Sequence, residues 1–106
     1  MPTIDVAAAM EGQSSLWQIL HTTDRSQIAV MVLAPGEASS AAMNVHPGED
    51  QLLFVTEGRL DAEIGAERTV VRAGQLALVP AGTPHRFVNR GDAPARTLNI
   101  YTPPAY

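Results

Sequence analysis

The sequence predicts an all-β protein, a jelly-roll barrel of about eight or nine short strands. Eight glycines punctuate the 106 residues, and from Gly36 onward they follow one another at intervals of 7 to 12 positions. This spacing is typical of short strands joined by turns. Hydrophobic residues make up 45% of the chain and charged residues 17%, as in ordinary globular proteins. We expect a single domain over residues 1–106, because a chain of this length supports one hydrophobic core.

One short helix is expected near the N-terminus, over residues 6–10. Asp5 precedes the run Val-Ala-Ala-Ala-Met as a suitable N-cap, and Gly12 lies just past its end. The remaining apolar or alternating segments predict strands. Their expected bounds are Leu16–Thr22, Gln27–Leu33, Ala42–His46, Gln51–Thr56, Leu60–Ile64, Thr69–Arg72, Leu76–Val79, His85–Val88 and Arg96–Tyr101.

Two of these strands are apolar at consecutive positions, at residues 52–55 and 76–79, so we expect both of their faces to be covered. Residues 60–64 instead alternate, with Asp61 and Glu63 on one face. This mixture favours a sandwich or a barrel, and the closed solution for so many short strands is a jelly roll. A strand buried on both faces also fits an interface between two copies, and we expect a homodimer.

Composition excludes several classes of chemistry. The chain contains no cysteine and no lysine, which removes thiolate and Schiff-base nucleophiles, disulfides and cysteine-ligated metals. The net charge is −4 and the seven arginines are scattered singly, so we expect no nucleic-acid partner. No apolar run is long enough to span a membrane, and the N-terminal residues lack a basic region. We therefore expect a cytoplasmic protein without a membrane partner.

The first candidate site segment runs from Asn44 to Gln51. Asn44 and His46 are two positions apart, so on a strand they project from the same face. Pro47 and Gly48 suit the two central positions of a type II turn. A reversal there would place the strand of Gln51 beside residues 44–46 and bring Gln51 near His46.

The second candidate segment runs from residue 74 to residue 89. It contains an apolar strand, a turn bounded by proline and glycine, and a strand that begins at His85. His85 and Phe87 share one face of that strand. If this face is the barrel interior, His85 joins Asn44, His46 and Gln51.

Both segments resemble the two motifs of the cupin superfamily, and the chain is similar to small single-domain bacterial cupins over residues 15–104. The second motif, G-x5-P-x-G-x2-H-x3-N, is matched in full over residues 74–89 by Gly74, Pro80, Gly82, His85 and Asn89. The first, over residues 36–58, is matched by Gly36, His46 and Gly58, with Asn44 for its first histidine and Gln51 for its glutamate. The resemblance implies a double-stranded β-helix. Glutamine at the glutamate position is usual in that branch.

The resemblance also implies one divalent transition metal ion, Mn, Fe, Co, Ni or Zn, held by His46, His85 and Gln51. Asn44 is either a fourth ligand or a hydrogen-bond partner of a metal-held water or substrate. Amide ligands carry no charge, so affinity is expected to be lower, and the ion more Lewis acidic, than in a cupin with glutamate.

Several other residues have a simpler interpretation. Glu49 and Asp50 lie close to Gln51, but a Pro-Gly-Glu-Asp stretch is typical of a solvated turn. The strand of His21 is expected to direct it outward. Asn89 is expected to tie down a strand end through backbone hydrogen bonds. Candidate pocket-lining side chains, each equally compatible with the core, are Trp17, Met31, Met43, Phe87 and Tyr101.

Three functions remain open from the sequence. The first is a metal-dependent enzyme acting on a small polar molecule, such as a keto acid, a sugar derivative or a phenolic compound, by oxygenase, isomerase, decarboxylase or lyase chemistry. The second is a non-catalytic module that binds a small molecule or metal. The third is a metal-free isomerase that uses His46 or His85 as a general base and needs a carboxylate to orient the imidazole.

Overall fold

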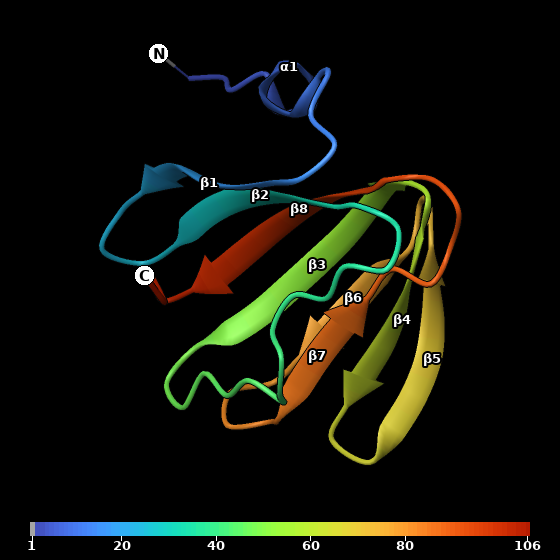
Figure 1. Cartoon of the computed structure of the whole chain (residues 1–106). Coiled ribbons are helices and arrows are strands. Elements are labelled where there is room, and N and C mark those ends of the chain that lie inside the picture. Colours follow the sequence, from blue (N-terminus) through green and yellow to red (C-terminus); the bar gives the residue numbers. More distant parts are fainter. Residues whose placement is uncertain (1) are drawn as a thin grey trace.

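The computed structural model describes residues 2–106 and contains eight strands and one short helix (Figure 1). The expected helix is confirmed as α1 (Val6–Met10), and the side chain of Asp5 accepts a hydrogen bond from the backbone N–H of Ala8. The strands are β1 (Leu16–Thr22), β2 (Gln27–Leu33), β3 (Asp50–Glu57), β4 (Arg59–Ile64), β5 (Glu67–Arg72), β6 (Leu76–Val79), β7 (His85–Val88) and β8 (Ala95–Thr102).

The strands form two antiparallel sheets that face each other as a jelly roll. One sheet has the order β1-β2-β8-β3-β6, and the other has the order β5-β4-β7 (Figure 1). The main hydrophobic core lies between the sheets, because the inward positions of both contribute apolar side chains. The core residues include Met31, Leu33, Leu53, Val55, Leu60, Ala62, Val71, Ala77, Val79 and Phe87.

The turn between β3 and β4 requires a glycine. Gly58 has a φ of 77°, in the left-handed region that favours glycine. A Cβ atom at this position would lie only 2.7 Å from the carbonyl oxygen of Pro94. The β3–β4 corner can therefore approach the segment before β8 only because residue 58 lacks a side chain.

The expected strand over residues 42–46 is absent. The chain between β2 and β3 instead runs as a long loop beside β7, where Asn44 forms one isolated bridge with His85. The side chain of Ser39 accepts a hydrogen bond from the backbone N–H of Phe87, and Ser39 N–H donates to Phe87 carbonyl. These contacts are between residues far apart in the sequence, so local pattern alone does not specify the conformation.

The prediction of a type II turn at Pro47-Gly48 is also wrong. Gly48 is not among the described glycines with positive φ, whereas a type II turn requires positive φ at its third residue. Residues 47 and 48 form a bend instead, and Gln51 pairs with Val79 and Tyr101 instead of with residues 44–46.

The expectation that two strands are covered on both faces is only partly met. On β6, Ala77 and Val79 are buried, but Leu76 and Leu78 are 50% and 59% exposed on the opposite face. The outer face of the five-stranded sheet is covered in part by α1, which packs near Val30 and Val32. The part of this face that β6 contributes has no cover within the described chain.

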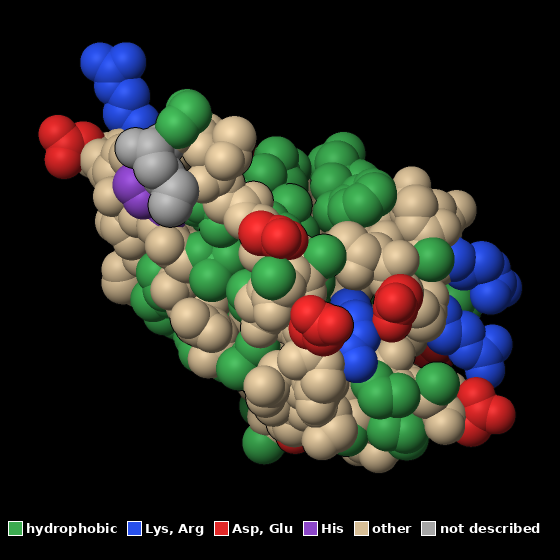
Figure 2. Space-filling model, turned by 90° about the horizontal axis from the view of Figure 1, so that it is seen from above, with side chains coloured by type: hydrophobic (Ala, Val, Ile, Leu, Met, Phe, Trp, Pro, Cys, Tyr) green, Lys and Arg blue, Asp and Glu red, His purple; other side chains and the backbone are tan. Residues whose placement is uncertain are grey.

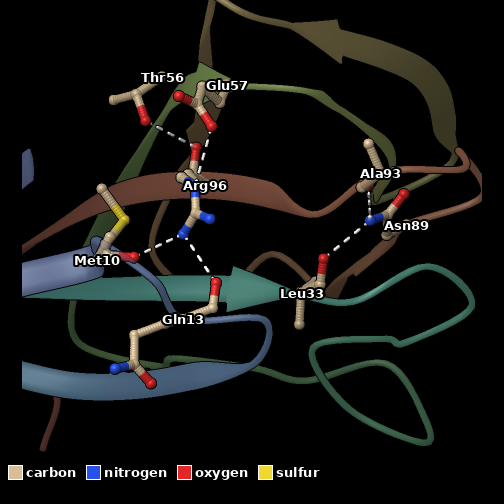
Figure 3. A network of polar contacts seen from close by, with 8 residues as sticks. All are labelled: Met10, Gln13, Leu33, Thr56, Glu57, Asn89, Ala93 and Arg96. Atoms are coloured by element: carbon tan, nitrogen blue, oxygen red, sulfur yellow. Dashed lines mark hydrogen bonds and ion pairs between the residues drawn. The ribbon is translucent and has the colours of Figure 1, made fainter.

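Two polar anchors hold the chain segments around the sheets (Figure 3). Asn89 is fully buried, and its side-chain amide donates to the carbonyls of Leu33 and Ala93, which confirms its expected structural role. Arg96 donates from Nη1 to the carbonyls of Met10 and Gln13, at 2.6 and 2.9 Å. Arg96 thus ties the N-terminal segment to β8.

Seen from above, basic side chains are visible at two ends of the molecule and another lies between acidic side chains, with hydrophobic side chains between the two ends (Figure 2). No helix within residues 2–106 has the length and hydrophobicity needed to cross a bilayer.

Candidate metal and ligand site

The four predicted ligand residues line one pocket inside the barrel. Asn44, His46, Gln51 and His85 come from the β2–β3 loop, β3 and β7, and they border a cavity of about 370 Å³. The structure therefore brings together residues that are up to 41 positions apart in the sequence. Gln51 reaches this pocket because alternate residues of β3 point inward, and not through the hairpin expected from the sequence.

His85 is fixed in one orientation and one tautomer. It is buried at the start of β7, and its Nδ1 lies 3.0 Å from the carbonyl oxygen of Thr83. A carbonyl oxygen can only accept, so Nδ1 carries the hydrogen and a neutral ring keeps its lone pair on Nε2. A backbone carbonyl that orients a histidine in this way is common behind metal-binding imidazoles.

His46 is also buried, and its ring centroid lies 5.0 Å from that of His85. Burial and the neighbouring His85 lower the pKa of His46, an effect that nearby Glu49 partly opposes. Burial and the proximity of His85 thus favour the neutral imidazole of His46, which is the form that binds metal ions.

Gln51 is oriented by a chain of buried hydrogen bonds. Its Nε2 donates to Asn99 Oδ1, and Asn99 Nδ2 donates to Thr97 Oγ1, both at 3.0 Å. Thr97 Oγ1 donates in turn to the carbonyl of Met31. Because the carbonyl of Met31 can only accept, the direction of each hydrogen bond in this series is fixed. The Gln51 amide nitrogen must therefore face Asn99, which leaves Gln51 Oε1 as an acceptor toward the pocket.

Gln51 Oε1 is the one buried side-chain polar atom within residues 2–106 that has no hydrogen-bond partner. An unsatisfied buried acceptor costs about 1–3 kcal/mol, so native proteins rarely leave one without a function or a bound partner. Two neutral imidazoles and a free amide oxygen around one pocket fit the ligand preferences of a divalent transition metal ion.

Asn44 lines the same pocket but is exposed, and its Oδ1 accepts a hydrogen bond from the backbone N–H of Val45 at 3.0 Å. Its backbone forms both hydrogen bonds of the bridge to His85, at 2.7 and 2.8 Å. In this arrangement Asn44 fixes the loop beside His85, and its side-chain amide lies at the rim.

The other ionisable candidates, Glu49, Asp50 and His21, do not line this pocket. Asp50 accepts a hydrogen bond from the backbone N–H of Ala81, and Glu49 from that of Gly48. His21 is exposed on β1 and is not part of the pocket lining. Within the described residues, no three histidine or acidic side chains gather closely enough to hold a metal ion by themselves. Besides the two histidines, the pocket offers the amide side chains of Gln51 and Asn44 as oxygen donors.

The wall and mouth of the pocket are aromatic and apolar. Four of the five suggested lining residues border the cavity, namely Trp17, Met31, Phe87 and Tyr101, whereas Met43 does not. Burial and hydrogen bonding with Tyr106 raise the pKa of Tyr101, so its phenol is protonated.

Sequence reasoning missed Tyr106 and the buried polar residues that support the site, which are Gln27, Thr97 and Asn99. The alternation Thr97-Leu98-Asn99-Ile100-Tyr101 was a usable signal, because the first, third and fifth residues share one face.

Comparison with known proteins agrees with this geometry. Residues 29–101 match the family profile of the Cupin domain, which covers more than half of the chain. The chain belongs to the cupin family. The crystal structure of BH2720 from Bacillus halodurans superimposes on this cupin with a TM-score of 0.89 and 28% identity, covering 100% of this chain and 84% of that one. The expected double-stranded β-helix is confirmed.

Curated relatives point to several activities. The tetracenomycin polyketide synthase protein TcmJ from Streptomyces glaucescens is 36% identical over 67% of this chain and 46% of its own length. A quercetin 2,3-dioxygenase from Bacillus subtilis is 29% identical over 55% of this chain and 17% of its own. The chain spans about half the length of the first curated relatives that it matches. Some related cupins are thus named as enzymes.

Proposed function

We propose that this cupin binds one divalent transition metal ion in the barrel and uses it to act on a small molecule in the same pocket. His46 and His85 would supply imidazole nitrogen, and Gln51 would supply amide oxygen. The observation that carries the proposal is the buried, unpartnered Oε1 of Gln51 in a pocket that also contains two buried histidines. The polyketide and dioxygenase relatives support it as proteins of the same family.

Different residues of the pocket would hold the ion and contact the ligand. A bound divalent ion supplies Lewis acidity toward a ligand oxygen. His85 is held by Thr83 and Gln51 by Asn99, so neither side chain must reorganise when it binds. The phenol of Tyr101, buried beside His46 with a centroid separation of 5.3 Å, adds a protonated polar group to the pocket wall.

The test is elemental analysis by plasma mass spectrometry of untagged protein purified without chelator. We expect close to one transition metal ion per chain in the wild type and loss of that metal in H46A and H85A. H21A is the matched control, because His21 is the third histidine of the chain and is exposed on β1. Protein that stays metal-free after reconstitution with Mn, Fe, Co, Ni and Zn would refute the proposal.

A non-catalytic binding module is the second candidate. The pocket lining has one acidic residue, Glu37, and both of its carboxylate oxygens accept a hydrogen bond from Ser15. No carboxylate of the described residues is therefore placed to act with the two histidines, which favours a binding module. The metal-free acid–base reaction has less support, because His85 Nδ1 is oriented by a backbone carbonyl and not by a carboxylate.

A further inference from the structure

The pocket has no cationic side chain to receive an anionic ligand. Within the described residues, its lining contains no arginine, and its one carboxylate, Glu37, adds negative charge at the rim. Arg86, which follows His85 on β7, donates from Nε to the carbonyl of Ser40 and does not line the pocket. Recognition of carboxylate or phosphate groups ordinarily uses arginine or lysine. The lining therefore disfavours sugar phosphates and dicarboxylates.

The mouth of the pocket instead presents aromatic rings. Trp17 and Tyr106 lie edge to face with centroids 5.2 Å apart, and Tyr101 lies 6.3 Å from Trp17 and 5.3 Å from Tyr106. Trp17 and Tyr106 are 43% and 56% exposed although they border the cavity. These two rings therefore keep open surface on which a planar ligand can pack.

The backbone of Tyr106 is held in position by a buried glutamine. Gln27 is 1% exposed, and its Nε2 donates to the carbonyl of Tyr106 at 2.8 Å. Its Oε1 accepts from the backbone N–H groups of Ala105 and Tyr106. Because both ends of one amide side chain are used, residues 105–106 are fixed beside the pocket before any ligand arrives. This preorganisation lowers the entropic cost of binding.

Four buried polar side chains form the inner part of the pocket, whereas Glu37 and Asn44 lie at its rim. The four are His46, His85, Gln51 and Tyr101, and Gln51 Oε1 still needs a partner. A ligand that fits both ends has an apolar planar body and one or two oxygen atoms at one edge. The cavity volume of about 370 Å³ is within the range of small-molecule sites.

We infer that the ligand of this site is a hydroxylated aromatic compound, uncharged in solution, whose ring packs against Trp17 and Tyr106 and whose hydroxyl oxygens point toward His46 and His85. This inference rests on the proposed function for the polar end and narrows it, since the sequence left keto acids, sugar derivatives and phenolic compounds open. The aromatic contacts are a property of the chain and do not require the metal.

Isothermal titration calorimetry tests this with catechol and quercetin as aromatic probes, and with oxalate and glucose phosphate as anionic probes. Each is titrated into zinc-loaded and chelator-stripped protein, because zinc has no redox chemistry that would consume catechol. In stripped protein, where only the side chains of the pocket act, we expect the aromatic probes to bind at least about tenfold more tightly than the anionic ones, and we expect the aromatic probes to bind zinc-loaded protein as well. Anionic probes that bind stripped protein as tightly as catechol would overturn the inference.

Variants at the mouth locate the ligand. We expect W17A and Y106A to weaken quercetin binding about tenfold and Y106F to retain it, because the ring and not the hydroxyl makes the contact. I19A is the matched control, since Ile19 is exposed on the same strand as Trp17 but does not border the pocket. Unchanged binding in both W17A and Y106A would overturn the inference.

Metal content, measured separately on each sample, keeps the two proposals distinct. Protein that retains zinc but binds neither aromatic probe would refute the ligand assignment and leave the metal proposal standing. If metal-free protein binds quercetin, and the same protein retains no metal when it is reconstituted, the metal proposal alone would be refuted.

Discussion

A single amide group, that of Gln51, carries most of the evidence for chemistry in this cupin. Its nitrogen is committed to Asn99, and the chain of donors that ends at the carbonyl of Met31 prevents Asn99 from reversing its amide without losing a hydrogen bond. The free oxygen is therefore a consequence of two neighbours on β8. The identity of Gln51 matters in two ways, as an acceptor toward the pocket and as a donor toward Asn99.

The substitution Q51E separates these two roles. A carboxylate adds a full negative charge, so we expect affinity for zinc to rise at least about tenfold in chelator competition. The same substitution removes the donor to Asn99 Oδ1, so we expect the free energy of unfolding of the metal-free protein in urea to fall by about 1–3 kcal/mol. Q18E, which adds the same charge at an exposed position of β1, is the control. Unchanged zinc affinity would mean that Gln51 does not contact the ion.

At the scale of elements, α1 has only five residues and depends on contacts with the sheet. An isolated helix of this length is unstable in water. Met10 buries its side chain against β2, and Arg96 binds the carbonyls of Met10 and Gln13. Arg96 also pairs with Glu57 and is only 20% exposed, so the anchor is shielded from solvent.

We expect R96Q to release the N-terminal segment from the sheet. Amide hydrogen exchange over residues 8–13 should accelerate at least about tenfold, with stability lowered by about 1–2 kcal/mol, because the guanidinium donors to Met10 and Gln13 are lost. R90Q is the matched control, since Arg90 forms an ion pair with Asp61 at a far more exposed position. Equal exchange rates in R96Q and R90Q would contradict this role of Arg96.

Elements whose bounds are marked by local sequence features were predictable from the sequence. Segments whose conformation depends on contacts with distant residues were not. The bounds of α1, β1, β2, β6 and β7 agree with the sequence analysis, because caps, glycines and alternation mark them locally. The loop after β2 depends on pairing with β7, which lies about forty residues further along the chain. Its conformation could not be read from its own residues.

The candidate site shows the same division. The histidines and Gln51 were found because motifs mark their positions, and the structure brings them to one pocket. Thr97 and Asn99 were missed because Leu98 and Ile100, which alternate with them, are the more obvious core residues. On β8, Thr97 and Asn99 are buried on the inner face, whereas Leu98 and Ile100 lie on the outer face. Which face is inside depends on what covers the outer face, which is a property of the whole molecule.

The outer face of the five-stranded sheet carries a continuous apolar row. Leu78, Leu52, Ile100 and Ile28 are direct cross-strand partners in that order, spanning β6, β3, β8 and β2. None of the four is fully buried, and Leu78 is 59% exposed. An apolar row of this kind, exposed in part, fits an interface between two copies of the chain.

We propose that this cupin is a homodimer in which the outer faces of the two sheets pack together. Light scattering at micromolar concentration should give twice the mass of the chain, and L78E should give the mass of one chain, because it places a charge on the most exposed residue of the apolar row. I19E is the control, since Ile19 is exposed on β1 at the opposite edge of the same sheet. Circular dichroism on each variant separates dissociation from unfolding. Wild-type protein that scatters as a single chain would refute the dimer, and Leu76 and Leu78 would then have to be tolerated in contact with water.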